Sequence, residues 1–150
     1  MYQDLLTAYK GLISEEKYEI SLLANTAAFV FEHIDKLNWA GFYLHQDKQL
    51  ILGPFQGKVA CNLIQPGKGV CGTSLVTKET IVVDDVANHP NHIYCDFNSK
   101  SELVIPIIIN DLVYGVFDFD APILKRFDHE LVNFLENIVK LLTNKLIEIK

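Results

Sequence analysis

Apolar residues recur at helical spacing near both ends of this chain, and short strand-like runs fill the sequence between them. Ser14, followed by two glutamates, predicts the start of a helix that continues to about residue 35. Asp128 predicts the start of a second long helix, in which Phe127 and Val132 could pack across the first turn. This order predicts an α+β fold, with an antiparallel sheet of about six strands and the N- and C-terminal helices packed on one face.

The strand-like runs are separated by residues that favour turns. Asn110 and Asp111 stand between the last two runs and predict a hairpin. Pro106 cannot donate a backbone hydrogen bond, so it favours a bulge or an edge position. A short leading helix and a weakly helical segment at 70–78 complete the pattern, and the polar segment 85–99 is expected to be a loop. The expected strands lie at residues 38–44, 50–52, 59–61, 80–84, 103–109 and 112–119.

Composition limits the classes of function open to the chain. Hydrophobic residues make up 49% of 150 residues, enough for one well-filled core, so we expect a single domain spanning 1–150. The net charge of -6 argues against nucleic acid and an anionic membrane surface as partners. The N-terminus lacks a signal-peptide pattern and no apolar run is long enough to span a bilayer, so we expect a cytoplasmic protein.

Three cysteines, Cys61, Cys71 and Cys95, lie in one stretch of the chain at intervals of ten and twenty-four residues. No close Cys-x-x-Cys pair is present, so we expect no metal site. Cys95 lies in the polar loop, where a thiol can be reached, and Cys71 lies near a predicted helix N-terminus, which would stabilise a thiolate. The alternative is that all three are small buried hydrophobic residues.

Carboxylates gather at the ends of two expected strands. Asp118 and Asp120 are two residues apart, so a strand would direct both side chains to one face and Phe119 to the other. Glu102 begins the partner strand of the same hairpin. Such crowding would raise at least one carboxyl pKa and would favour a cationic or proton-sharing ligand. The alternative is that these acids mark solvated strand ends, and that Trp39 belongs to the core instead of lining a pocket.

Four segments together resemble the free methionine-(R)-sulfoxide reductase family: residues 38–43, 53–57, 69–72 and 118–120. The resemblance covers nearly the whole chain. It implies a single catalytic GAF domain over residues 1–150 that reduces free L-methionine-(R)-sulfoxide and needs no cofactor. It also implies an oxidised cysteine that is returned to the thiol by thioredoxin, with protein-bound methionine sulfoxide excluded as a substrate.

The resemblance also implies roles for individual residues. Cys95 matches the nucleophile of the family, which would become a sulfenic acid, and Cys61 and Cys71 match the two cysteines available to form a disulfide with it. Cys61 is the first choice as the resolving residue, and Cys71 is the alternative. The residues that match the substrate pocket are Trp39, Glu102, Asp118 and Asp120.

Two questions stay open at the level of sequence. A GAF-type domain can also be a non-catalytic sensor of a small molecule or of redox state, because a fold alone does not determine function. The long terminal helices could cover the sheet or pair across the axis of a homodimer, and their periodicity does not distinguish these uses.

Overall fold

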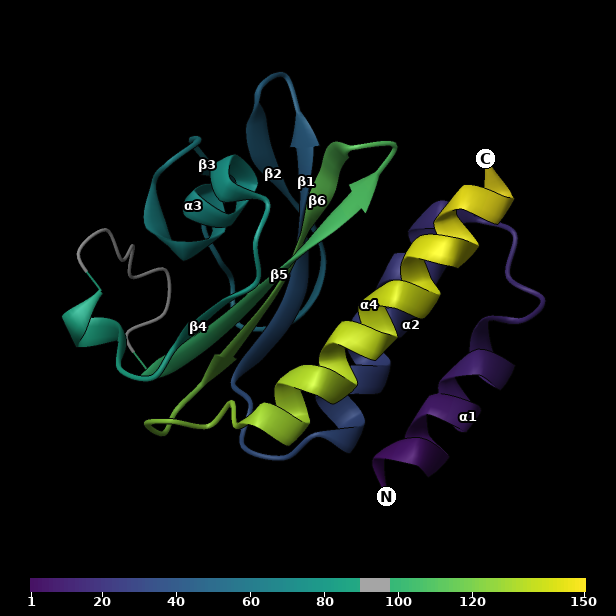
Figure 1. The fold of residues 1–150 in the computed structure, drawn as a ribbon, viewed down its shortest axis with the longest axis horizontal. Coiled ribbons are helices and arrows are strands. Elements are labelled where there is room, and N and C mark those ends of the chain that lie inside the picture. Colours follow the sequence, from purple (N-terminus) through teal and green to yellow (C-terminus); the bar gives the residue numbers. More distant parts are fainter. Residues whose placement is uncertain (90–97) are drawn as a thin grey trace.

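The structure, a computed structural model, describes residues 1–89 and 98–150. Its centre is a six-stranded antiparallel sheet with the strand order β3-β2-β1-β6-β5-β4 (Figure 1). This confirms the expected α+β class and the antiparallel sheet. The strands are β1 (Trp39–Gln46), β2 (Gln49–Gly57), β3 (Leu63–Ile64), β4 (Ile81–Val83), β5 (Ser101–Ile109) and β6 (Leu112–Ala121).

Helices cover both faces of the sheet. The long helices α2 (Glu19–His33) and α4 (His129–Ile149) pack on one face, and α1 (Tyr2–Ile13) lies outside them, as Figure 1 shows. The short helix α3 (Gly69–Thr77) lies on the opposite face. A single 3-10 turn, η1 (Val86–Asn88), follows β4. In the described parts of the chain, every helix is too short or too polar to cross a bilayer.

The sheet separates two hydrophobic cores because side chains alternate along each strand. In β6, Phe117 and Phe119 are fully buried in the core beneath α2 and α4. Val116 points to the other core, which lies beneath α3. Asp118 lies between the two phenylalanines in sequence, so its side chain is directed to the α3 side of the sheet. The terminal helices therefore pack on an apolar face, and the opposite face is free to carry polar groups.

Two hairpins fix the order of the central strands. Asn110 and Asp111 both have positive φ, 53° and 65°, and connect β5 to β6 in a two-residue turn. Asp47 and Lys48, with φ of 54° and 63°, connect β1 to β2 in the same way. Polar residues that tolerate the left-handed region permit both turns, and the hairpin predicted at Asn110 and Asp111 is confirmed.

Three local predictions differ from the structure. Ser14 does not begin a helix: it ends α1, and its hydroxyl donates to the carbonyl of Gly11. A Glu16 carboxylate oxygen instead accepts the amides of the two following residues, and α2 begins only at Glu19. The expected strand at 59–61 is absent, and the strand in this region is β3. The strand expected at 50–52 continues as β2 to Gly57.

Other predictions of local structure are confirmed. Asp128 caps α4 by accepting the amide of Leu131 at 2.9 Å. Phe127 is buried in the core against which the partly buried Val132 also packs. Pro106 lies in β5 beyond Val104, the last β5 residue that pairs with β4. It therefore occupies a local sheet edge, next to the irregularity between Ile107 and Ile108.

Gly41 shows how closely β1 and β2 approach around Trp39. A Cβ atom added at Gly41 would lie 2.3 Å from the Cβ of Phe55 and 2.6 Å from Cη2 of the Trp39 indole. Because Gly41 has no side chain, the indole of Trp39 can occupy this space. The indole also stacks on Phe55, with ring centroids 5.2 Å apart.

We predict that Gly41→Ala lowers the free energy of unfolding by about 1–3 kcal/mol, because the methyl group overpacks the contact between Trp39 and Phe55. Gly11→Ala is the matched control: nothing lies within 4 Å of its added Cβ. Gly11 lies in the last turn of α1, where alanine should stabilise the protein by about 0.5 kcal/mol, the low end of the effect in a helix interior. Urea unfolding followed by circular dichroism measures both. Equal stability of Gly41→Ala and the wild type would contradict this account of the contact.

Candidate active site

A cavity opens on the α3 side of the sheet, between α3, the segment that follows β2, and the strands β1, β5 and β6. It holds about 520 Å³ of space, including the solvent at its mouth. All four residues predicted to bind substrate line it, together with Cys71. The described lining residues are Trp39, Tyr43, Val59, Ala60, Ile64, Lys68, Gly69, Val70, Cys71, Ser99, Glu102, Asp118 and Asp120.

The sheet register brings the predicted pocket residues together. Asp120 in β6 lies directly opposite Trp39 in β1 and directly opposite Glu102 in β5. Residues paired in this way project to the same face of an antiparallel sheet. Asp118, two residues from Asp120, occupies the next row on that face, opposite Gly41. The predicted convergence of the three acids on one face is therefore confirmed.

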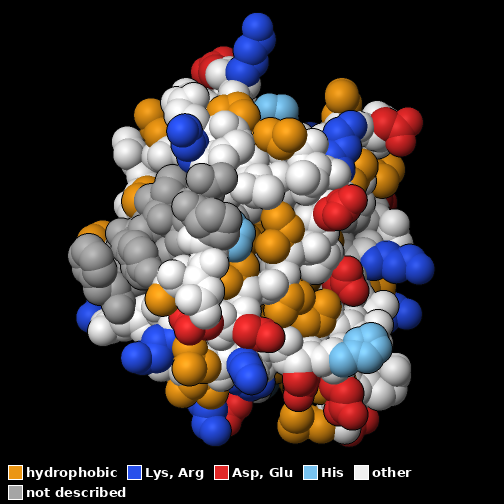
Figure 2. Space-filling view, turned by 60° about the vertical axis from the view of Figure 1, so that its left-hand side comes forward, with side chains coloured by type: hydrophobic (Ala, Val, Ile, Leu, Met, Phe, Trp, Pro, Cys, Tyr) orange, Lys and Arg blue, Asp and Glu red, His pale blue; other side chains and the backbone are white. Residues whose placement is uncertain are grey.

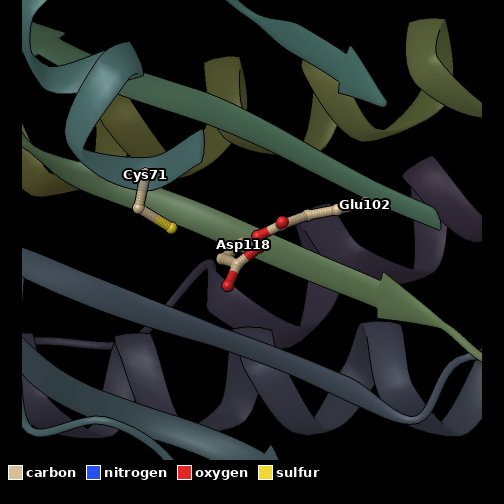
Figure 3. A group of neighbouring side chains, drawn as sticks. All are labelled: Cys71, Glu102 and Asp118. Carbon is tan, nitrogen blue, oxygen red and sulfur yellow. The ribbon is translucent and has the colours of Figure 1, made fainter. Parts of the chain in front are cut away.

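Cys71 completes an acid and thiol cluster with two of these carboxyls. The Cys71 sulfur, a Glu102 carboxyl oxygen and an Asp118 carboxyl oxygen all lie within 4.8 Å of one another. Figure 3 shows the Cys71 side chain descending from α3 toward Asp118, while Glu102 reaches the same point from β5. The exposed fractions of Cys71, Glu102 and Asp118 are only 4%, 6% and 5%. Such a donor set could hold a metal ion, but only with loss of the protons that these groups carry.

Burial makes the carboxyl groups of Glu102 and Asp118 weaker acids than ordinary carboxyl groups. It raises the pKa of Glu102 to about 8, and the negative charge of Asp120 adds to this shift. Burial also raises the pKa of Asp118 well above its usual range, and the charge of Glu102 raises it further. One Asp118 oxygen, Oδ1, is buried and accepts no hydrogen bond from the residues that the structure describes. The cluster can therefore donate protons near neutral pH, and Oδ1 of Asp118 can accept a hydrogen bond from a ligand.

The prediction that Cys71 forms a stabilised thiolate is wrong. Cys71 does lie in the first turn of α3, as expected. However, burial raises the pKa of its thiol well above the usual value, and the neighbouring charges of Asp118 and Glu102 raise it further. Loss of solvation and repulsion by carboxylates outweigh the favourable helix dipole. Cys71 is consequently a neutral thiol, hydrogen-bonded to Asp118.

Trp39 forms one wall of the cavity and is held in a single position. It is 2% exposed, so the prediction of a buried aromatic residue and that of a pocket residue both hold. Its indole stacks on Tyr43 with ring centroids 5.8 Å apart, and its Nε1 donates to the carbonyl of Lys58 at 3.0 Å. A ring fixed by stacking and a hydrogen bond offers a rigid apolar surface to a small ligand.

The three cysteines are in different states or positions. Cys61 lies in the irregular segment between β2 and β3 and is disulfide-bonded. Cys71 is free. Cys95, the predicted nucleophile, lies outside the described residues.

Three polar residues of the cavity carried no functional prediction from the sequence. Tyr43 lies four residues after Trp39, and period-two alternation could have placed both on one face. Ser99 accepts a hydrogen bond from the side-chain amide of Asn38, a contact between distant segments that no local pattern encodes. Lys68 is the N-cap residue of α3 and brings a cation to the cavity. From the sequence alone, a lysine next to the Pro66-Gly67 turn would be interpreted as an ordinary solvated side chain.

The surface around the molecule carries charges of both signs. On the face shown in Figure 2, Lys and Arg side chains are interspersed with Asp and Glu, and apolar side chains lie between them. This mixed distribution fits a net charge of -6 better than it fits a concentrated basic surface.

Comparison with known proteins defines the class to which this fold and cavity belong. Residues 22–146 match the GAF domain family. The chain is 47% identical over 148 residues to free methionine-R-sulfoxide reductase of Saccharomyces cerevisiae, covering 93% of this chain and 82% of that protein. It is 41% identical over 138 residues to the Escherichia coli protein of the same name, covering 92% and 84%. Free methionine-R-sulfoxide reductase from Neisseria meningitidis, solved in complex with its substrate, superposes with a TM-score of 0.93 at 36% identity, over 97% and 88% of the two chains.

The matched family and the six-stranded sheet define a GAF-domain protein. Within that class, identity above 40% over most of its length shows that the chain belongs to the free methionine-R-sulfoxide reductase family. The resemblance found in the four sequence segments is thereby confirmed.

The high pKa of Glu102 predicts a stability that depends on pH. This pKa is about 8 in the folded protein against 4.5 for an unperturbed carboxyl, so between these pH values the folded protein binds the extra proton. The free energy of unfolding should therefore fall as pH rises through this window, by about 1.4 kcal/mol per pH unit for one proton. Glu102→Gln, which cannot ionise, should show a shallower decline in urea unfolding.

Glu79→Gln makes the same chemical change at an exposed position and is the matched control. It should keep the wild-type slope. If Glu102→Gln also keeps that slope, Glu102 is not a buried neutral acid.

Proposed function

We propose that this protein reduces free L-methionine-(R)-sulfoxide to L-methionine, with residues 1–150 acting as one catalytic unit. The observation that carries the proposal is the cluster of Glu102, Asp118 and Asp120 on one face of the cavity, with Glu102 holding a proton to about pH 8. A sulfoxide oxygen must be protonated or strongly hydrogen-bonded before a thiolate can attack sulfur. The family relationship also supports free methionine-(R)-sulfoxide as the substrate, because the yeast and Escherichia coli relatives are named free methionine-R-sulfoxide reductases.

The charges around the cavity fit a free amino acid. The lining includes three carboxyl groups, among them the buried Oδ1 of Asp118 that no described group satisfies, which suits the substrate ammonium. It also includes Lys68 and the first residues of α3, where the positive end of the helix dipole suits a carboxylate. A methionine sulfoxide within a polypeptide lacks both charges. The presence of both kinds of group supports the free amino acid as the substrate and argues against the protein-bound form.

The first half of the reaction transfers oxygen to sulfur of the enzyme. The Cys95 thiolate attacks the sulfoxide sulfur, while protonated Glu102 hydrogen-bonds to the sulfoxide oxygen and supplies the proton. The sulfur–oxygen bond of the substrate breaks, methionine leaves, and Cys95 becomes a sulfenic acid. Two electrons pass from Cys95 to the substrate. The indole of Trp39 would flank the thioether side chain and keep water away from the reacting sulfur.

The second half of the reaction removes the sulfenic acid. We assign Cys61 as the resolving residue: its thiol attacks the sulfenic sulfur, a disulfide forms, and the oxygen leaves as water. Cys61 being disulfide-bonded while Cys71 is free supports this choice. Cys71 is also a poor nucleophile, because its thiol is neutral. An external dithiol such as thioredoxin would then reduce the disulfide by exchange in the cytoplasm.

Single-turnover measurements separate the two halves. We predict that Cys95→Ser releases no methionine from free methionine-(R)-sulfoxide, while Cys61→Ser releases one equivalent and then stops in the presence of thioredoxin, its reductase and NADPH. The (S) epimer should give no NADPH consumption with the wild type. Disulfide formation with peroxide in a wild-type protein that never turns over the sulfoxide would identify a redox sensor instead. Equal first-turnover yields from Cys95→Ser and the wild type would remove Cys95 as the nucleophile.

Cys71 should contribute a hydrogen bond and no redox step. We predict that Cys71→Ser keeps multiple turnovers, with kcat reduced by about five-fold or less, because serine can still donate to Asp118. Cys71→Ala should lose more activity than Cys71→Ser, since its methyl group leaves Asp118 without that donor. If Cys71→Ser stops after one turnover, as Cys61→Ser is expected to do, Cys71 takes part in recycling.

A further inference from the structure

The segment that carries Cys61 is held in place by hydrogen bonds from its neighbours. We call residues 58–62, which have no regular secondary structure, the Cys61 strap. The carbonyl of Lys58 accepts the indole Nε1 of Trp39 at 3.0 Å, and the carbonyl of Cys61 accepts the hydroxyl of Tyr43 at 2.8 Å. At the far end, the carbonyl of Asn62 accepts the amide of Leu52 at 2.9 Å.

The two side-chain donors are themselves rigid. Trp39 and Tyr43 both lie on β1, are each 2% exposed, and stack with an interplanar angle of 25°. Tyr43 lies opposite Leu52 in β2 and Val116 in β6, in the middle of the sheet. Within the strap, Val59 is 88% exposed, and Ala60 is partly buried against the core beneath α3. The hydrogen bonds from these rigid donors therefore help to fix the position of the strap, together with the disulfide bond of Cys61 and the packing of Ala60.

We propose that the Tyr43 hydroxyl is a positioning group for the second half of the reaction. By holding the Cys61 carbonyl, it fixes the backbone from which the Cys61 thiol attacks the sulfenic acid. In that step one sulfur–sulfur bond forms, the sulfur–oxygen bond breaks, and the hydroxyl leaves with the thiol proton as water. Attack between two groups of one chain is fast only when they are held in a reactive geometry. The proposal rests on the proposed function, with Cys61 as the resolving residue.

Tyr43 also lines the cavity, which allows a competing role in binding substrate. The two roles affect different steps. A residue that contacts substrate alters methionine release in the first turnover, whereas a residue that positions Cys61 alters only the disappearance of the sulfenic acid. Measuring both steps in one sample therefore separates them.

Tyr43→Phe removes the hydroxyl and keeps the ring, so the stack with Trp39 is preserved. With free methionine-(R)-sulfoxide as the probe, rapid quenching gives the rate of methionine release, and dimedone trapping with mass spectrometry gives the lifetime of the sulfenic acid. We expect sulfenic acid resolution to be slowed by about five-fold relative to methionine release, the effect of one lost hydrogen bond. Tyr9→Phe is the matched control, because the Tyr9 hydroxyl is also buried and bonded, to Thr26 at 2.7 Å, far from the cavity.

Several results would overturn the proposal. Wild-type resolution in Tyr43→Phe, an equal slowing of both steps, or the same slowing in Tyr9→Phe would each exclude a specific positioning role. A variant that partly unfolds does not obscure the test, because unfolded molecules release no methionine and the ratio of the two rates comes from folded molecules. If the wild type releases no methionine, the proposed function fails. If it does so and Tyr43→Phe resolves normally, only the role of Tyr43 fails.

Discussion

Alternation of side chains along β6 ties the hydrophobic core to the pocket. Phe117 and Phe119 are fully buried beneath the long helices, so the residues between and after them, Asp118 and Asp120, must face the other way. A shift of one residue in the register would place carboxylates in the core and phenylalanines in the cavity. The packing of α2 and α4 therefore determines where the acids lie. Because β1 and β5 pair with β6, the same register also sets the positions of Trp39 and Glu102.

The cost of this arrangement is the crowding of carboxyl groups away from water. Glu102 and Asp118 are almost fully buried, and both respond by holding their protons to unusually high pH. A structure selected for stability alone would not place them together. The cost has a chemical use in the proposed reaction, since a neutral acid can hydrogen-bond to a sulfoxide oxygen. The thiol of Cys71 shares this environment and is kept neutral by the same physical cause.

Much of this architecture could be predicted from sequence because it depends on local periodicity. Alternation in β6, the two-residue turn at Asn110 and the cap at Asp128 each depend on a few neighbouring residues. The error at Ser14 has a specific cause: Glu16 accepts the amides of the interhelical segment, which leaves Ser14 to end α1. Sequence propensity could not show which of two acceptors the local amides would choose.

Sequence patterns do not encode the tertiary contacts that decide other features. The strand expected at 59–61 is missing because the carbonyls of Lys58 and Cys61 bind aromatic side chains instead of a neighbouring strand. The reactivity assigned to Cys71 from its place in a helix was reversed by carboxyl groups more than thirty positions further along the chain. Family resemblance supplied the cysteine roles. Geometry added Tyr43, Lys68 and Ser99 to the list of residues around the cavity.

The central claim is that Glu102 is a neutral acid at neutral pH, held so by burial and by the neighbouring Asp120. A carbon-13 NMR titration of its side-chain carboxyl, assigned with Glu102→Gln, measures this directly in the substrate-free protein. The account predicts a midpoint near pH 8, whereas a midpoint near the unperturbed value of 4.5 would contradict it.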